Sequence, residues 1–94
     1  MAKKLSPKEI KQLLAAHPHW LKSGKEISRT FSFKNYYETM AFVNAVAFIA
    51  HGQDHHPDLE VGYNKCKVRF SSHDVGGLSD KDFAGAAKVD GLAG

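Results

Sequence analysis

The 94-residue sequence predicts an α+β domain in which a four-stranded antiparallel sheet carries helices on one face. Two observations lead to this prediction. Helical and strand-type patterns follow one another in the order α-β-β-α-β-β-α, and only a short turn separates the two strands of each pair. Strands joined by short turns pair antiparallel. A chain of this length has room for one core, so residues 1–94 are treated as a single domain.

The first predicted helix covers residues 6–16. Ser6 and Glu9 have the spacing of a capping box, and Pro7 suits the first helical position. Apolar residues follow at helical spacing, namely Ile10, Leu13 and Leu14.

A hairpin is predicted next, over residues 20–33. Ser23 and Gly24 indicate the turn, and polar and apolar residues alternate after it. The apolar positions of the second strand are Ile27, Phe31 and Phe33. Arg29 falls on the same face, and we place it at the rim of the core.

A second helix is predicted from its N-cap, Asn35, to Gly52, a residue suited to the left-handed end of a helix. One of its apolar sides holds Met40, Val43 and Ala47, and another holds Phe42, Val46 and Ile49. Only a narrow sector at Asn44 is polar. Because a helix that is apolar over most of its circumference is usually covered on more than one side, we expect one side to pack on the sheet and another on a second subunit.

The second hairpin is predicted over residues 59–71, with Asn64 in its turn. The alternating apolar residues are Leu59, Val61 and Tyr63 before the turn and Cys66, Val68 and Phe70 after it. Gly76 and Gly77 then interrupt the chain. Ser79 and Asp82 repeat the capping-box spacing and begin the last helix.

Charge and composition exclude several classes of protein. The formal net charge is +3, but the basic residues are scattered among acidic ones, so no nucleic-acid-binding arm is predicted. A single cysteine cannot form an internal disulfide, which fits a reducing compartment. No apolar segment approaches the roughly 20 residues that cross a bilayer. We therefore expect a cytoplasmic protein without a membrane or direct nucleic-acid partner.

Three of the six histidines, His55, His56 and His73, lie beside the second hairpin. If its strands pair around Asn64, the segments before and after it meet at its open end, so His56 and His73 can face one pocket. Pro57 favours an extended backbone at His56, which points the side chains of His55 and His56 in opposite directions and implies different roles. Imidazole exchanges protons near neutral pH, and this suits general acid–base catalysis such as the elimination of water.

Blander interpretations remain open for the same residues. A histidine beside proline in a polar loop is often a solvated surface residue. His51 and His55 have the spacing of a helical metal-ligand pair, although Gly52 is expected to end the helix between them and no recognised zinc pattern is present. Asp82 is explained by its capping position alone. Cys66, on an apolar strand face, is expected to be a core residue and not a nucleophile.

The spacing HHP-x5-Y-x9-H-x8-D, formed by residues 55–57, Tyr63, His73 and Asp82, resembles the signature of the pterin-4a-carbinolamine dehydratase family. The resemblance extends over nearly the whole chain. It implies an enzyme that removes water from 4a-hydroxytetrahydropterin to give quinonoid dihydropterin and so recycles the pterin cofactor of aromatic amino-acid hydroxylases. No metal or organic cofactor is implied, since the pterin is the substrate.

The resemblance also implies roles for individual residues. His55 and His73 would act as general acids for loss of the 4a-hydroxyl, and His56 would bind and orient the pterin and assist proton removal. Asp82 would complete the catalytic set. The implied pocket-lining residues are these three histidines together with Pro57, Ser72, Asp74 and Val75.

The family fold implies a homodimer or homotetramer joined through sheet edges and helices, with a functional link to an aromatic amino-acid hydroxylase. Many relatives carry an acidic residue where this chain has His51, and a protonated His51 would lower the affinity of its neighbours for protons. Some relatives bind a transcription factor as a dimerisation cofactor. The alternative function is therefore a protein-interaction module, a dimerisation cofactor or transcriptional coactivator without a physiological dehydratase role.

Overall fold

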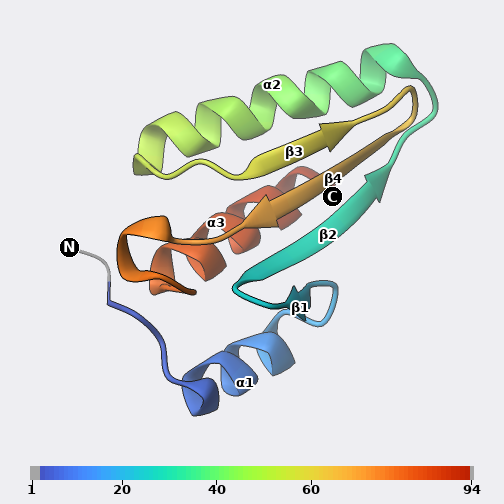
Figure 1. The fold of residues 1–94 in the computed structure, drawn as a ribbon. Coiled ribbons are helices and arrows are strands. Elements are labelled where there is room, and N and C mark those ends of the chain that lie inside the picture. Colours follow the sequence, from blue (N-terminus) through green and yellow to red (C-terminus); the bar gives the residue numbers. More distant parts are fainter. Residues whose placement is uncertain (1–2, 94) are drawn as a thin grey trace.

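Three α-helices and four strands alternate along residues 3–93, the part of the chain that the computed structural model describes (Figure 1). In chain order the elements are α1 (Pro7–Ala16), β1 (Leu21–Ser23), β2 (Glu26–Ser32), α2 (Tyr36–Gln53), β3 (Asp58–Val61), β4 (Lys65–Phe70), the short 3-10 helix η1 (His73–Val75), α3 (Asp80–Asp90) and the 3-10 helix η2 (Gly91–Ala93). This order confirms the predicted fold class. Residues 1, 2 and 94 of the predicted domain lie outside the described residues.

The strands form one antiparallel sheet in the order β1-β2-β4-β3. The two central strands pair from Ile27 opposite Phe70 to Ser32 opposite Lys65. The second hairpin pairs Val61 with Cys66, so its turn occupies residues 62–64. The predicted strand position of Tyr63 is wrong: Tyr63 lies in this turn, exposed to solvent, because β3 ends at Val61.

The core lies between one face of the sheet and the helices. The inward residues of β2 and β4 are almost completely buried, and they are Ile27, Phe31, Cys66, Val68 and Phe70. Side chains from all three helices join the same cluster, including Leu13 and Leu14 from α1, Phe42 and Val46 from α2, and Phe83, Ala86 and Val89 from α3. The helices therefore cover one face of the sheet, as predicted.

Both predicted capping boxes are present. Ser6 and Glu9 exchange side-chain and backbone hydrogen bonds at the start of α1, and Ser79 and Asp82 do the same at the start of α3. Hydrogen bonds from the backbone and side chain of Ser6 lower the pKa of Glu9. The two helix starts are thus determined by four-residue segments of sequence.

The second helix ends one residue beyond the predicted position, and the prediction that Gly52 is its left-handed terminator is wrong. The helix continues through Gln53, whose amide packs closely against α3, since a Cβ on Gly85 would lie 2.7 Å from Gln53 Nε2. Asp54 ends the helix with a left-handed φ of 50°. Aspartate is one of the few residues other than glycine that adopt this conformation routinely.

Arg29 of the first hairpin and the outer side of α2 differ in how the rest of the chain covers them. Arg29 lies at the rim of the core as predicted, with its guanidinium 4.3 Å from the centre of the Phe31 ring. On the outer side of α2, Tyr37 and Phe48 are both 80% exposed. This side of the helix is therefore uncovered within the described chain.

Candidate active site

His55 leaves the end of α2 in a defined direction. The backbone N–H of Asp54 donates to the carbonyl of His51 at 3.2 Å, and that of His55 donates to the carbonyl of Ala50 at 3.1 Å. These are the two hydrogen bonds of a Schellman motif, which closes the end of a helix and fixes the path of the chain beyond it. The imidazole of His55 is thereby directed toward α3.

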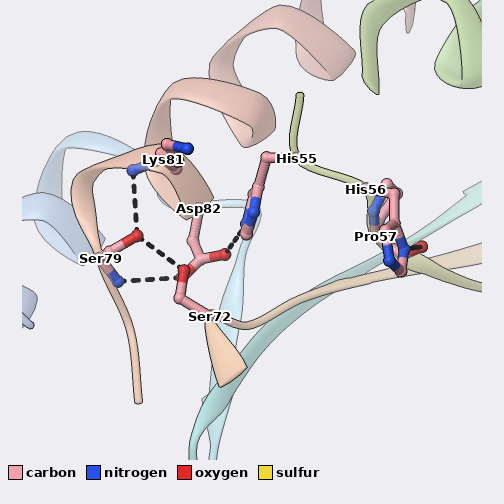
Figure 2. A network of polar contacts seen from close by, with 7 residues as sticks. All are labelled: His55, His56, Pro57, Ser72, Ser79, Lys81 and Asp82. Carbon is pink, nitrogen blue, oxygen red and sulfur yellow. Dashed lines mark hydrogen bonds and ion pairs between the residues drawn. The ribbon is translucent and has the colours of Figure 1, made fainter. Parts of the chain in front are cut away.

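A buried hydrogen-bond network receives this imidazole (Figure 2). His55 Nε2 lies 2.6 Å from Asp82 Oδ1. The other oxygen, Asp82 Oδ2, accepts from Ser72 Oγ at 2.8 Å and from the backbone N–H of Ser79 at 2.9 Å. Ser72 Oγ and Ser79 Oγ are 2.6 Å apart. Asp82 thus combines the predicted capping role with a direct contact to a predicted site histidine.

The network determines which nitrogen of His55 can react. Asp82 is completely buried, and a buried carboxylate is stable only when donors surround it. A carboxylate accepts and does not donate, so Nε2 of His55 is the donor, and Nδ1 remains to exchange a proton with a substrate. Phe70 stacks on the imidazole with ring centres 6.0 Å apart and planes at 15°, and so restrains its tilt.

His56 lies in different surroundings from its neighbour. Its side chain is exposed, its Nδ1 lies 3.1 Å from the carbonyl oxygen of Pro57, and it points away from the Asp82 network in Figure 2. The extended chain before Pro57 therefore separates the two side chains as predicted. Their different catalytic roles stay a prediction.

His73 is held beside them by a tight turn after β4. Ser72 and Gly77 pair through two backbone hydrogen bonds, of 2.9 and 3.3 Å. Between them the backbone N–H of Gly76 donates to the carbonyl of His73, and Gly76 has a left-handed φ of 67°. Most residues with a Cβ are strained in this conformation, so the glycine allows the turn to close.

One cavity of about 170 Å³ brings the three predicted histidines together. Its lining residues are Asp54, His55, His56, Asp58, Arg69, Ser71, His73 and Asp74. Of the other predicted residues, Ser72 lines an adjoining hollow, Asp82 lies behind His55, and Pro57 and Val75 are not among the lining residues of either space. The sequence thus predicted the histidines of the cavity correctly, but only Asp74 of the other predicted lining residues lies in its wall.

Four lining residues were not predicted: Asp54, Asp58, Arg69 and Ser71. Asp54 and Asp58 flank the segment His55–Pro57, so their place in the cavity wall could have been predicted from the sequence. Arg69 belongs to the polar face of β4, and nothing in the sequence near it indicated a place in the cavity wall. Its Nε lies 3.6 Å from Glu60 Oε2, too far for a hydrogen bond, and has no hydrogen-bond partner among residues 3–93.

The metal interpretation rested on His51 and His55. The helix ends at Gln53, so the two histidines do not share one helical face. Within the described part of the chain, no three His, Cys, Asp or Glu side chains are grouped so that they could hold a metal ion.

Comparison with protein families bears directly on this site. The family model described as Pterin 4 alpha carbinolamine dehydratase matches residues 3–92. The chain belongs to this family. The dehydratase that the family description names is a hydro-lyase, the enzyme class that the resemblance implies.

Close relatives share most of the chain. A protein of Nitrosospira multiformis, provisionally named a pterin-4-alpha-carbinolamine dehydratase, is 59% identical over 88 residues that cover 94% of this chain and 78% of the relative. A protein of Bdellovibrio bacteriovorus with the same provisional name is 55% identical over 94 residues, covering 96% of this chain and 78% of the relative.

Solved structures show the same fold. A transcriptional coactivator/pterin dehydratase from Brucella melitensis superposes with a TM-score of 0.93 at 30% identity, covering 98% of this chain and 100% of that one. A pterin dehydratase-like protein described as a RuBisCO assembly factor in the α-carboxysome superposes with a TM-score of 0.65 at 26% identity, covering 80% of this chain and 87% of that one.

None of the helices within residues 3–93 has the length and apolar character needed to span a membrane.

Proposed function

We propose that the protein converts a 4a-hydroxytetrahydropterin into the quinonoid dihydropterin and water by histidine acid–base catalysis. The observation that carries this proposal is the single cavity lined by His55, His56 and His73, with Asp82 buried behind His55. Membership of the dehydratase family supports the substrate class. A functional link to an aromatic amino-acid hydroxylase, the source of such a substrate, is part of the proposal.

The reaction is redox neutral, so histidines alone can supply its needs. The C4a–O bond breaks as the hydroxyl takes a proton from an imidazolium and leaves as water. The proton on the neighbouring N5 passes to a neutral imidazole, and the N–H electron pair forms the C4a–N5 double bond. Protonation of the leaving group and removal of the second proton are both tasks for general acid–base catalysts.

The surroundings of each histidine support the roles proposed for it. Asp82 orients His55 so that Nδ1 can donate to the leaving hydroxyl, and His73, across the same cavity, is the second general acid. His56 is exposed and free of the Asp82 network, which suits binding of the pterin and proton removal from it.

The remaining predicted residues take supporting parts in this proposal. Asp74 lines the cavity beside His73 and is available to the polar edge of the pterin. The Ser72 hydroxyl is already engaged with Asp82, so Ser72 would contact substrate through its backbone. Pro57 and Val75 would support the two segments that carry the histidines.

Stopped-flow absorbance of 4a-hydroxytetrahydropterin decay tests the proposal. The wild type is expected to accelerate the decay, and His56→Ala to lose about 10²-fold or more of that acceleration, the range for a general acid or base. His56 is exposed, so its loss should disturb little packing and the variant should keep the native fold. His19→Ala, the loss of an exposed histidine outside the cavity, is the matched control.

Acceleration by the wild type and the His19 variant, but not by the His56 variant, supports the dehydratase. Equal acceleration by all three would exclude the proposed role of His56. No acceleration by any of them would reject the enzymatic proposal and leave the interaction module as the better function.

The outer face of α2 supports assembly into a homo-oligomer. Tyr37, Ala41, Asn44, Phe48 and His51 follow one another at spacings of four and three residues, and all are exposed. Residues with this spacing form the seam along which helices pack in coiled coils and bundles, and we call these five residues the α2 seam. A domain this small also gains stability by burying surface against another copy.

Sedimentation velocity of Phe48→Glu tests the assembly. A charge in the α2 seam is expected to shift the distribution toward the monomer, whereas Leu92→Glu, which alters an exposed apolar residue of η2 that is on neither the α2 seam nor an edge strand, should leave it unchanged. A monomeric wild type would reject the homo-oligomer. It would favour the alternative that this face binds a different protein, a role consistent with the coactivator description of the Brucella melitensis relative.

A further inference from the structure

A groove leads from the histidine cavity toward the N-terminal segment. A hollow of about 450 Å³ shares Ser71 and His73 with the cavity. A third hollow, of about 320 Å³, shares Lys25, Gly76 and Gly77 with the second. The shared residues place the three spaces next to one another.

The two walls of this groove come from separate parts of the chain. The turn between β1 and β2 supplies one wall. The other is the turn around η1, beside which the N-terminal segment runs in Figure 1. Leu5 N donates to the carbonyl of Leu78 at 2.8 Å, and Lys4 forms an isolated bridge with Ser79. The side chain of Lys4 then passes over Gly77, where a Cβ would lie 3.1 Å from Lys4 Cε.

Charge is distributed unevenly along the groove. Lys25 and Glu26 line the hollow next to His73, whereas Lys4, Lys22 and Lys25 line the far hollow with no acidic residue. Lys22 Nζ donates to the carbonyl of Gly24 at 2.8 Å, which keeps its ammonium group at the turn. The floor of the far hollow is apolar and consists of Leu5, Pro7, Ile10 and Leu78. Such a surface suits a negatively charged group carried on an apolar spacer.

The chemistry of the proposed substrate directs one substituent into this groove. The reacting atoms of the pterin are C4a and N5, and the variable side chain is attached to C6, which is bonded to N5. That side chain therefore begins beside the histidines. His73 borders both the cavity and the adjoining hollow, so the groove is the nearest space for a side chain that leads away from the reacting atoms.

We propose that this lysine-lined groove binds an anionic substituent at C6 of the pterin, a phosphate or a carboxylate. The inference rests on the proposed function and narrows its substrate class. Lys25 is the first lysine beyond the cavity, whose own wall holds Arg69, and it meets a short anionic side chain, while Lys4 and Lys22 meet a longer one.

Equilibrium binding of stable dihydropterins to the full chain tests the inference. The ligands are 7,8-dihydroneopterin, whose side chain is uncharged, its 3′-phosphate, and 7,8-dihydrofolate, whose carboxylates follow an aromatic spacer. The wild type is expected to bind both anionic ligands about threefold to tenfold more tightly than the neutral one, as one to three exposed ion pairs allow. This advantage should shrink in about 0.5 M salt, because salt screens exposed charges.

Paired variants assign the advantage to the groove. Lys22→Gln with Lys25→Gln should remove most of it and leave the affinity for 7,8-dihydroneopterin unchanged. Lys11→Gln with Lys88→Gln removes the same charge from exposed residues outside the groove and should preserve it. Lys4→Gln should weaken 7,8-dihydrofolate more than the short phosphate ester.

Equal affinity for neutral and anionic ligands, or equal losses in the two double variants, would overturn the inference. Inorganic phosphate that binds with the same lysine dependence but leaves the affinity for the phosphate ester unchanged would also overturn it, since the anion site would then be separate from the pterin site. If the wild type still turns over a neutral 4a-hydroxytetrahydropterin in any of these cases, the proposed dehydratase function stands. If the wild type binds none of the three pterins and turns over no 4a-hydroxytetrahydropterin, both proposals are rejected.

Discussion

Helix α3 carries an aspartate near each end, and each aspartate holds a ring nitrogen from a distant part of the chain. At the N-terminal end, completely buried Asp82 holds Nε2 of His55 at 2.6 Å. At the other end, Asp90 accepts from Trp20 Nε1 at 2.9 Å and from Arg29 Nη1 at 2.6 Å, with 27% of its side chain exposed. Hydrogen bonds to an aspartate thus connect both ends of the helix to the rest of the fold.

The two ends differ in what their partners can do. An indole N–H only donates, and a guanidinium keeps its charge, so the Asp90 cluster has no proton to exchange. An imidazole gains and loses a proton near neutral pH. Of these two carboxylates, only Asp82 belongs to a reactive site, because only its partner can titrate and borders a cavity.

Replacement of each carboxylate by its amide should give the largest difference. Asp82→Asn places an N–H₂ group among buried donors, and we expect a loss of about 3 kcal/mol in the free energy of unfolding and about 10²-fold in dehydration rate. Asp90→Asn should cost about 1 kcal/mol and leave the rate unchanged. Urea unfolding and stopped-flow assays measure both quantities, and equal effects on the rate would refute the comparison.

Two glycines of this segment give a second contrast: Gly85 lies in the middle of α3, and Gly91 is its C-cap residue. A Cβ on Gly85 would lie 2.7 Å from Phe70 Cζ, and Phe70 stacks on His55. Gly85→Ala should therefore lose about 1–3 kcal/mol of stability and also reduce the dehydration rate. Gly91 has open space around it and a helical φ of −61°, so Gly91→Ala should change stability by less than about 1 kcal/mol and leave the rate intact.

A native-like rate in a destabilised Gly85→Ala protein would show that Phe70 does not restrain His55. Thermal unfolding and rates measured on the same samples decide this.

Ser72→Ala sharpens the role of the network around Asp82. The change removes one donor to Asp82 Oδ2, and we expect a stability loss of about 1–2 kcal/mol. If Ser72 acts by positioning Asp82 and His55, kcat should fall about tenfold, or about 1.4 kcal/mol, while KM stays constant. A raised KM with an unchanged kcat would instead make Ser72 a substrate contact.

Cys66 shows what burial does to a titratable side chain that has no charged or hydrogen-bonded partner among residues 3–93, and the expected effect is the smallest. Desolvation raises the pKa of this fully buried thiol. The unfolded chain then loses the proton first, near pH 8.5, so stability is complete below that pH and falls as pH rises toward the folded pKa, by at most about 1.4 kcal/mol per pH unit.

Urea unfolding between pH 7 and 10 measures this loss. The difference between the wild type and Cys66→Ala isolates the thiol, because all other titrating groups are common to both. Parallel pH profiles for the two proteins would contradict the prediction.

Much of the fold was predictable because its determinants are local. The capping boxes at Ser6 and Ser79 each lie within four residues, and the turn at Gly24 requires only a positive φ, observed at 60°. The strand alternation that placed Cys66 in the core is equally local. Where local rules competed with packing, packing prevailed: the helix passed Gly52 because Gln53 packs against α3.

The site divides along the same line. The sequence by itself determined the order of elements, the helix starts and, through the spacing of its histidines, the dehydratase family. Only the tertiary structure decided that Asp82 meets His55, 27 residues away, and that Arg69 and Ser71 join the cavity wall. A hydrogen bond inside one turn depends on neighbouring residues, whereas a contact between elements depends on how helices and strands pack, which no short segment of sequence specifies.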